Sequence, residues 1–163
     1  MKFLFFLLTM ALVVWVQLTV NYFGGAIGLS ANVVLIAALY FGLSRGPMTG
    51  VCLGFVWGLL IDASSLGLIG LNAFLFASAG YMAGLLRRQL DGHKAWTQTI
   101  FTLGVSMLFV VLFFVFDRLF AVGVHSFSSS LLVQPLLNAI LAPVIFWVIF
   151  HWAQLWNMLP RER

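Results

Sequence analysis

Long apolar stretches, interrupted by a few charged residues, dominate the chain. The uncharged stretches are residues 3–44, 46–61, 63–86, 95–116 and 119–160. Apolar residues follow one another continuously in them, whereas a strand of a transmembrane barrel would place a polar residue at every second position. The pattern therefore predicts membrane-spanning helices. Because the hydrocarbon core is about 30 Å thick and one span needs about 20 apolar residues, the chain has room for about six spans.

Local breaks divide these stretches into six predicted spans within a single membrane domain, residues 1–163. The glycines of residues 23–28, Gly24, Gly25 and Gly28, predict a turn after the first span, because glycine lowers helix propensity. Arg45-Gly46-Pro47 predicts a break between the second and third spans, since proline removes a backbone donor. Asp62 ends the third span, and Asn72 is a candidate cap for the fourth. The predicted spans are residues 3–22, 31–44, 48–61, 71–86, 96–116 and 131–156.

The basic residues predict how the spans are oriented. The second and third predicted spans are short, so residues 31–61 could instead form one broken span, giving five spans in all. With six spans and both ends in the cytoplasm, only Arg118 among the basic residues faces outwards, which matches the positive-inside rule. Six spans with both ends inside are therefore the better prediction. The cytoplasmic basic residues then include four in the loops, which set topology and secondarily attract anionic lipid: Arg45, Arg87, Arg88 and Lys94.

Composition excludes several classes of protein. The chain is 63% hydrophobic and 7% charged, where a soluble domain has roughly 45–50% apolar and about 25% charged residues. A large catalytic or nucleic-acid-binding domain is excluded, and the basic balance is explained by topology. Cys52 is the only cysteine, so no internal disulfide and no CxxC motif exist. The first apolar run is longer than the hydrophobic region of a signal peptide, about 7–15 residues, and predicts a retained span.

Groups that could carry chemistry are few. The chain has four acidic residues and three histidines, His93, His125 and His151, which are far apart in sequence. It has no HExxH motif and no GxxxxGK[ST] loop. We therefore expect neither a catalytic centre, nor a metal site, nor a cofactor.

Glycines at four-residue spacing form the most informative pattern. Gly50, Gly54 and Gly58 lie on one face of the third predicted span, and the same spacing leads to Asp62. Close packing across small residues supplies much of the energy of helix association in lipid. The stripe therefore packs either against the fourth span, where Gly80 and Gly84 repeat the spacing, or against a partner's helix.

Two polar residues leave further alternatives open. Asp62 is either a fixed polar anchor for the loop of residues 63–70 or a helix-end residue that faces water. Asn138 lies in apolar sequence, so its amide must find a partner, and it marks an inward face of the sixth span.

Residues 40–88 contain a set of residues whose order and spacing are specific when taken together. They are Arg45-Gly46-Pro47, Gly50, Gly54-Phe55, Gly58-Leu59-Leu60-Ile61-Asp62, Ser65, Gly70, Ala73, Gly80-Tyr81, Gly84 and Arg87-Arg88. In this set the stretch resembles the MreD family of bacterial rod shape-determining proteins. The sequence departs from the family pattern at Ala31, Leu66 and Asn72, which affects the predicted shape of the outer loop.

The resemblance implies a non-catalytic subunit of the elongation (Rod) complex in the bacterial inner membrane. Implied partners are the single-span protein MreC, the MreB filament, RodA and a penicillin-binding transpeptidase. The implied fold is an all-α bundle of six spans, similar to the substrate-binding subunits of energy-coupling-factor transporters. We hypothesise that a partner's helix packs on the glycines named above, with Asp62 contributing at the outer side.

The alternative function is that of such a transporter subunit for a vitamin-sized molecule. A ligand of this size needs several convergent polar groups. The spans offer few of them, which favours the scaffold; the candidates are Gln17, Asn21, Asn32, Asn72, Gln98 and Asn138. A lipid-modifying enzyme, the third possibility, lacks a convincing acid, base or nucleophile constellation.

Overall fold

The computed structural model describes residues 2–27, 31–64, 68–90, 94–120 and 130–155. These residues form helices joined by turns and contain no strand. The helices are α1 (Lys2–Ile27), α2 (Val33–Arg45), α3 (Pro47–Ala63), α4 (Leu71–Leu86), α5 (Ala95–Leu119) and α6 (Ser130–Leu155). The all-helical prediction is therefore confirmed.

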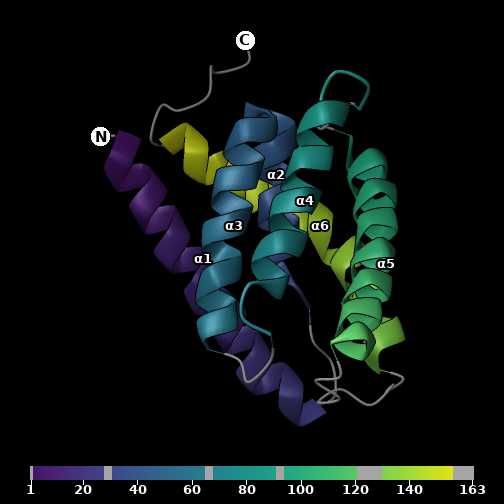
Figure 1. Cartoon of the computed structure of the whole chain (residues 1–163). Helices are drawn as coiled ribbons and strands as arrows, with labels where there is room; N and C mark the ends of the chain where they lie inside the picture. Colours follow the sequence, from purple (N-terminus) through teal and green to yellow (C-terminus); the bar gives the residue numbers. More distant parts are fainter. Residues whose placement is uncertain (1, 28–30, 65–67, 91–93, 121–129, 156–163) are drawn as a thin grey trace.

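The helices form an antiparallel bundle in which successive helices run in opposite directions (Figure 1). One end of the bundle contains the start of α1, the α2–α3 turn, the end of α4 and the end of α6. We call it the basic end because it carries Arg45, Arg87, Arg88 and Lys94. The opposite end, where α3 leads into α4, we call the Asp62 end. Helix α2 lies inside the bundle, and every residue from 33 to 43 is buried.

Helix length divides the bundle into two groups. Three helices contain apolar windows long enough to cross a membrane, at Leu4–Gly24, Ala95–Phe116 and Val133–Leu155. The other three, α2, α3 and α4, are apolar but have only 13, 17 and 16 residues. The long helices α1 and α5 flank the short ones, and α6 crosses behind them (Figure 1).

The boundaries of two helices show how local sequence signals compete with helix continuity. The predicted break at Arg45-Gly46-Pro47 is present, and Gly46 has a φ of 100°, which a residue with a side chain adopts only with strain. The predicted turn is wrong at Gly24 and Gly25, because α1 continues to Ile27, and its last glycine, Gly28, lies outside the described residues. Glycine costs a helix only about 1 kcal/mol, less than the cost of an unpaired backbone group in lipid.

Helices α3 and α4 make the most extensive contact of any two described helices. A Cβ atom on Gly50 would lie 2.5 Å from the carbonyl oxygen of Gly80, and one on Gly54 would lie 2.5 Å from that of Phe76. The same position on Gly58 falls on the backbone of Ala73. Since the obstructing atoms belong to the backbone, the two helices touch only because these positions lack side chains. We call this pair the α3–α4 hairpin.

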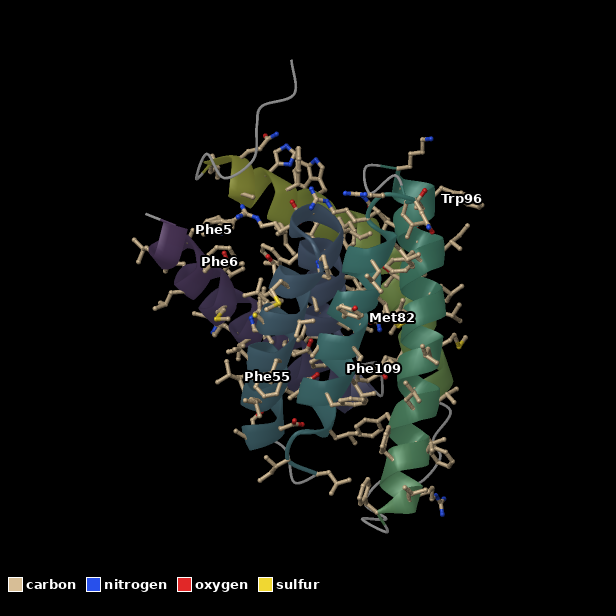
Figure 2. All side chains as sticks on the ribbon, turned by 45° about the horizontal axis from the view of Figure 1, so that its top comes forward. Phe5, Phe6, Phe55, Met82, Trp96 and Phe109 are labelled. Carbon is tan, nitrogen blue, oxygen red and sulfur yellow. The ribbon has the colours of Figure 1, made fainter. Side chains whose placement is uncertain are left out.

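Aromatic rings connect the hairpin to its neighbours. Phe76 of α4 stacks on Phe109 of α5, with 5.2 Å between the ring centroids, and Figure 2 shows Phe109 in the space between these helices. On the opposite side, Phe41 of α2 lies 5.8 Å from Trp57 of α3 and 6.4 Å from Phe6 of α1. Bulky rings therefore fill the wider gaps between helices, while glycines allow the close contact of α3 with α4.

We expect Gly54→Ala to destabilise the bundle by about 1–3 kcal/mol, the usual cost of forcing extra atoms into a packed contact. The matched control is Gly104→Ala on α5, where nothing lies within 4 Å of the added methyl group and helix propensity favours alanine. Thermal unfolding of the purified variants in mild detergent measures both. Equal melting temperatures for the two variants would contradict close α3–α4 packing.

Candidate functional site

Asp62 lies at the end of α3 and is only 1% exposed. Its Oδ2 accepts hydrogen bonds from the backbone N–H groups of Gly70, at 2.8 Å, and Ala73, at 3.2 Å. Its Oδ1 accepts from the backbone N–H of Asn72, at 3.3 Å, and from the Asn72 Nδ2, at 2.8 Å. Of the two alternatives left open by the sequence, Asp62 is therefore the polar anchor and not a residue that faces water.

The role of Asp62 follows from how α4 begins. Gly70 precedes the first turn with a φ of 97° and has no side chain with which to cap the helix. The first N–H groups of a helix lack partners within it, and a negative charge there is favourable. The carboxylate of Asp62 supplies both the acceptors and the charge from the preceding helix. The prediction that Asn72 caps α4 is wrong: Asn72 lies within the first turn and its side chain donates to Asp62.

The six residues hypothesised to contact a partner's helix all lie at the α3–α4 contact. Gly50, Gly54 and Gly58 face α4 on successive turns. Gly80 lies against Gly50, and Gly84 lies against the backbone of Pro47. Because α4 covers the stripe on α3, and α3 covers the stripe on α4, a partner's helix has no access to either glycine face in this arrangement. The geometry thus corresponds to the intramolecular alternative.

A second polar cluster surrounds the start of α2. The Oδ1 of Asn138, on α6, accepts from the Asn32 N–H at 2.7 Å, and its Nδ2 donates to the Ser106 Oγ on α5 at 3.1 Å. Gln17, on α1, accepts from the Val34 N–H at 3.2 Å and donates to the Ala31 carbonyl at 3.1 Å. The sequence predicts that the Asn138 amide needs a hydrogen-bond partner. It does not indicate that this partner is the backbone at the start of α2.

This cluster explains why α2 can be so short. At 1.5 Å per residue, its 13 residues reach only about 20 Å, so its first turn begins within the protein. Non-helical backbone is tolerated at membrane depth only where protein groups satisfy it. The side-chain amides of α1 and α6 described above supply such groups at the start of α2. The Asn32 Oδ1 supplies another, because it accepts from the Leu35 N–H at 3.0 Å.

The same hydrogen bonds bear on the transporter alternative. Most of the polar residues that could have formed a ligand pocket form hydrogen bonds with the backbone, with one another or with Asp62: Gln17, Asn21, Asn32, Asn72 and Asn138. Their polar groups therefore stabilise helix ends and contacts between helices. The structure therefore gives the transporter alternative no support.

The basic end gathers four cationic residues. Arg87, Arg88 and Lys94 are exposed, whereas Arg45 is half-buried. The Arg45 guanidinium lies 5.8 Å and 5.4 Å from the ring centroids of Phe5 and Phe6, two residues of α1 that Figure 2 shows near this end. Trp96 projects away from the bundle nearby (Figure 2). Arg118 belongs to the opposite end and lies 5.1 Å from the Phe114 ring.

Titratable side chains do not converge elsewhere in the described part of the chain. No group of three or more histidine, cysteine, aspartate or glutamate residues occurs there that could hold a metal ion. His151 is exposed, with its Nδ1 3.0 Å from the Trp147 carbonyl oxygen, and Cys52 is exposed on α3. His93 and His125 lie outside the described residues.

We expect Asp62→Ala to lower the free energy of unfolding by about 2–4 kcal/mol, because it leaves several donors at the start of α4 without an acceptor. Ser64→Ala is the matched control, since its exposed hydroxyl donates only to the Ile61 carbonyl. Unfolding in mixed micelles compares the two variants. A loss no larger for Asp62→Ala than for Ser64→Ala would contradict the capping role.

We expect Asn138→Leu, which keeps a similar volume, to destabilise the bundle by about 1–2 kcal/mol, because it strips the Asn32 N–H of its acceptor. Ser106→Ala removes only the second of the two hydrogen bonds of Asn138 and should cost less. Hydrogen exchange at the start of α2 provides a local readout. Unchanged protection of the Asn32 amide in Asn138→Leu would contradict the assignment.

Comparison with known proteins identifies the family. A family model described as rod shape-determining protein MreD matches residues 1–156 of the 163-residue chain. No curated protein and no solved structure gives a significant match, so the likeness to energy-coupling-factor subunits stays a prediction. The match extends well beyond the glycine-rich region that carries the sequence resemblance and includes Asn138. The chain belongs to the MreD family and therefore to a family of membrane proteins that determine rod shape.

Proposed function

We propose that this chain is a non-catalytic subunit of the bacterial elongation (Rod) complex that binds an MreC-like single-span protein and so helps to position lateral peptidoglycan synthesis. The family match over residues 1–156 carries the proposal. The MreB filament, RodA and a penicillin-binding transpeptidase are the further proposed partners. The polar side chains of the bundle support a scaffold, because the two clusters around Asp62 and Asn138 form hydrogen bonds with backbone groups at helix ends.

The proposed location is the inner membrane, with six spans and both termini in the cytoplasm. Two features support it: successive helices run in opposite directions, and Arg45, Arg87, Arg88 and Lys94 share one end (Figure 1). Basic residues are retained on the cytoplasmic side. The Asp62 end then faces the periplasm, where peptidoglycan is assembled.

In this proposal, the glycines and Asp62 serve partner binding through the hairpin that they build. Direct contact of a partner's helix with Gly50 or Gly54 would require α3 and α4 to separate. The hairpin is held along its length by glycine contacts and at one end by the four hydrogen bonds to Asp62. A partner therefore binds a bundle whose shape depends on residues that the partner does not touch.

We expect Gly54→Leu to abolish both rescue of rod shape and recovery of a single-span partner, because leucine cannot fit against the α4 backbone. Gly104→Leu, on the exposed face of α5, is the matched control and should leave both unchanged, because nothing lies within 4 Å of a Cβ atom at this position. The measurements are cell shape in a strain that lacks the native gene, and mass spectrometry of proteins that remain bound after gentle extraction from native membranes.

The outcomes separate the candidate functions. Recovery of a single-span protein with wall synthases supports the scaffold, and its loss in Gly54→Leu supports the role of the hairpin. Normal rod shape and undiminished partner recovery with Gly54→Leu would contradict that role. Recovery of paired ATPases with a transmembrane coupling subunit would replace the scaffold with the transporter.

A further inference from the structure

The outward surface of the α3–α4 hairpin is apolar and uncovered by any other described helix. It faces the viewer in Figure 1, while α2 and α6 lie behind it. Its glycines lie at the contact between the two helices, and Trp57 and Phe76 point into the bundle. A second set of large side chains points outwards. We call this surface the hairpin face; its exposed residues are Met48, Phe55, Val56, Leu59 and Leu60 of α3, and Tyr81, Met82 and Leu85 of α4.

The hairpin face is shorter than the hydrocarbon core of a membrane. At 1.5 Å per residue, the 17 residues of α3 reach about 26 Å and the 16 residues of α4 about 24 Å, against a core about 30 Å thick. Helices α1, α5 and α6, with 26, 25 and 26 residues, each reach about 38 Å. The same protein therefore presents a short apolar surface on one side and long ones on the others.

Both ends of the hairpin face are fixed by contacts. At the basic end, α3 begins directly after the Gly46 turn, and Arg87 and Arg88 follow α4 at once. At the Asp62 end, the hydrogen bonds from Gly70 and Ala73 to Asp62 hold the start of α4 against the end of α3. The glycine contacts prevent the two helices from sliding past each other. Tilting the hairpin would shorten its reach across the membrane further.

A membrane that meets a short apolar surface adapts by thinning, at a cost of a fraction of a kcal/mol per Å of mismatch. The alternative, a change in the protein, is opposed here by the Asp62 cap and the glycine contacts. We infer that acyl chains of the lipid bilayer cover the hairpin face and that the bilayer is locally thinner there, by about 4–6 Å, than around α1, α5 and α6. The inference rests on the proposed six-span topology, in which α3 and α4 cross the membrane, and does not depend on the proposed partner.

The test measures the depth of two spin labels in the purified, reconstituted full chain. In a Cys52→Ser background, one label replaces Val56, near the middle of α3, and the other replaces Met107, at the middle of α5. Both positions are exposed, so neither substitution disturbs internal packing. Accelerated relaxation by oxygen and by a nickel chelate reports the depth of each label below the lipid surface.

In phosphatidylcholine vesicles with 18-carbon chains, we expect the label at position 56 to lie about 2–3 Å nearer the surface, half of the thickness difference. The difference should shrink in 14-carbon vesicles, which match the hairpin, and grow in 22-carbon vesicles. A third label at Ile140, exposed on α6, should behave like the one at Met107.

Two results would overturn the inference. Equal depths at positions 56 and 107 in all three vesicles would mean that the bilayer is not thinned. Spin–spin broadening confined to the label at position 56 would mean that a second copy of the chain, and not lipid, covers the hairpin face. Because no partner protein is present, neither result bears on membership of the Rod complex.

Discussion

The bundle depends on satisfying backbone groups where short helices begin inside a membrane protein. Water meets this need in a soluble protein, but side chains must do so in hydrocarbon. Here the side chains come from neighbouring helices: Asp62 of α3 for the start of α4, and Gln17 and Asn138 for the start of α2. Each cap therefore also joins two elements. Removing one such side chain weakens a helix end and a tertiary contact at the same time.

The glycine stripes complement these caps by allowing backbone to approach backbone. Gly50 and Gly80 meet about one turn from the basic end of the hairpin, and Gly58 meets α4 near its start, close to Asp62. Van der Waals contact along the hairpin and hydrogen bonds at its end thus act on the same pair of helices. Since apolar side chains gain nothing by leaving lipid for one another, this combination replaces the hydrophobic effect that would hold a soluble hairpin together.

The sequence predicts much of this fold, because apolar runs and their breaks are strong local signals. The six helices and the turn at Gly46 follow from them. The turn at Gly24 and Gly25 fails because a weak propensity yields to the need for continuous backbone pairing. The candidate site is only partly predictable: spacing shows that the glycines share a face, and a buried amide at Asn138 requires a partner. Local patterns do not show which surface meets the glycines or that Asp62, and not Asn72, caps α4. Both depend on contacts between helices.

The two caps also differ in when they can form during synthesis. The bonds to Asp62 join residues 8 to 11 positions apart, so the hairpin can close as soon as α4 has entered the membrane. The bond between Asn32 and Asn138 joins residues 106 positions apart. The start of α2 must therefore wait for α6, which leaves the nascent chain with an incompletely paired helix end until nearly all of it has been made. A chain truncated before α6 would contain every residue of the hairpin but would lack the acceptor for the Asn32 N–H at the start of α2.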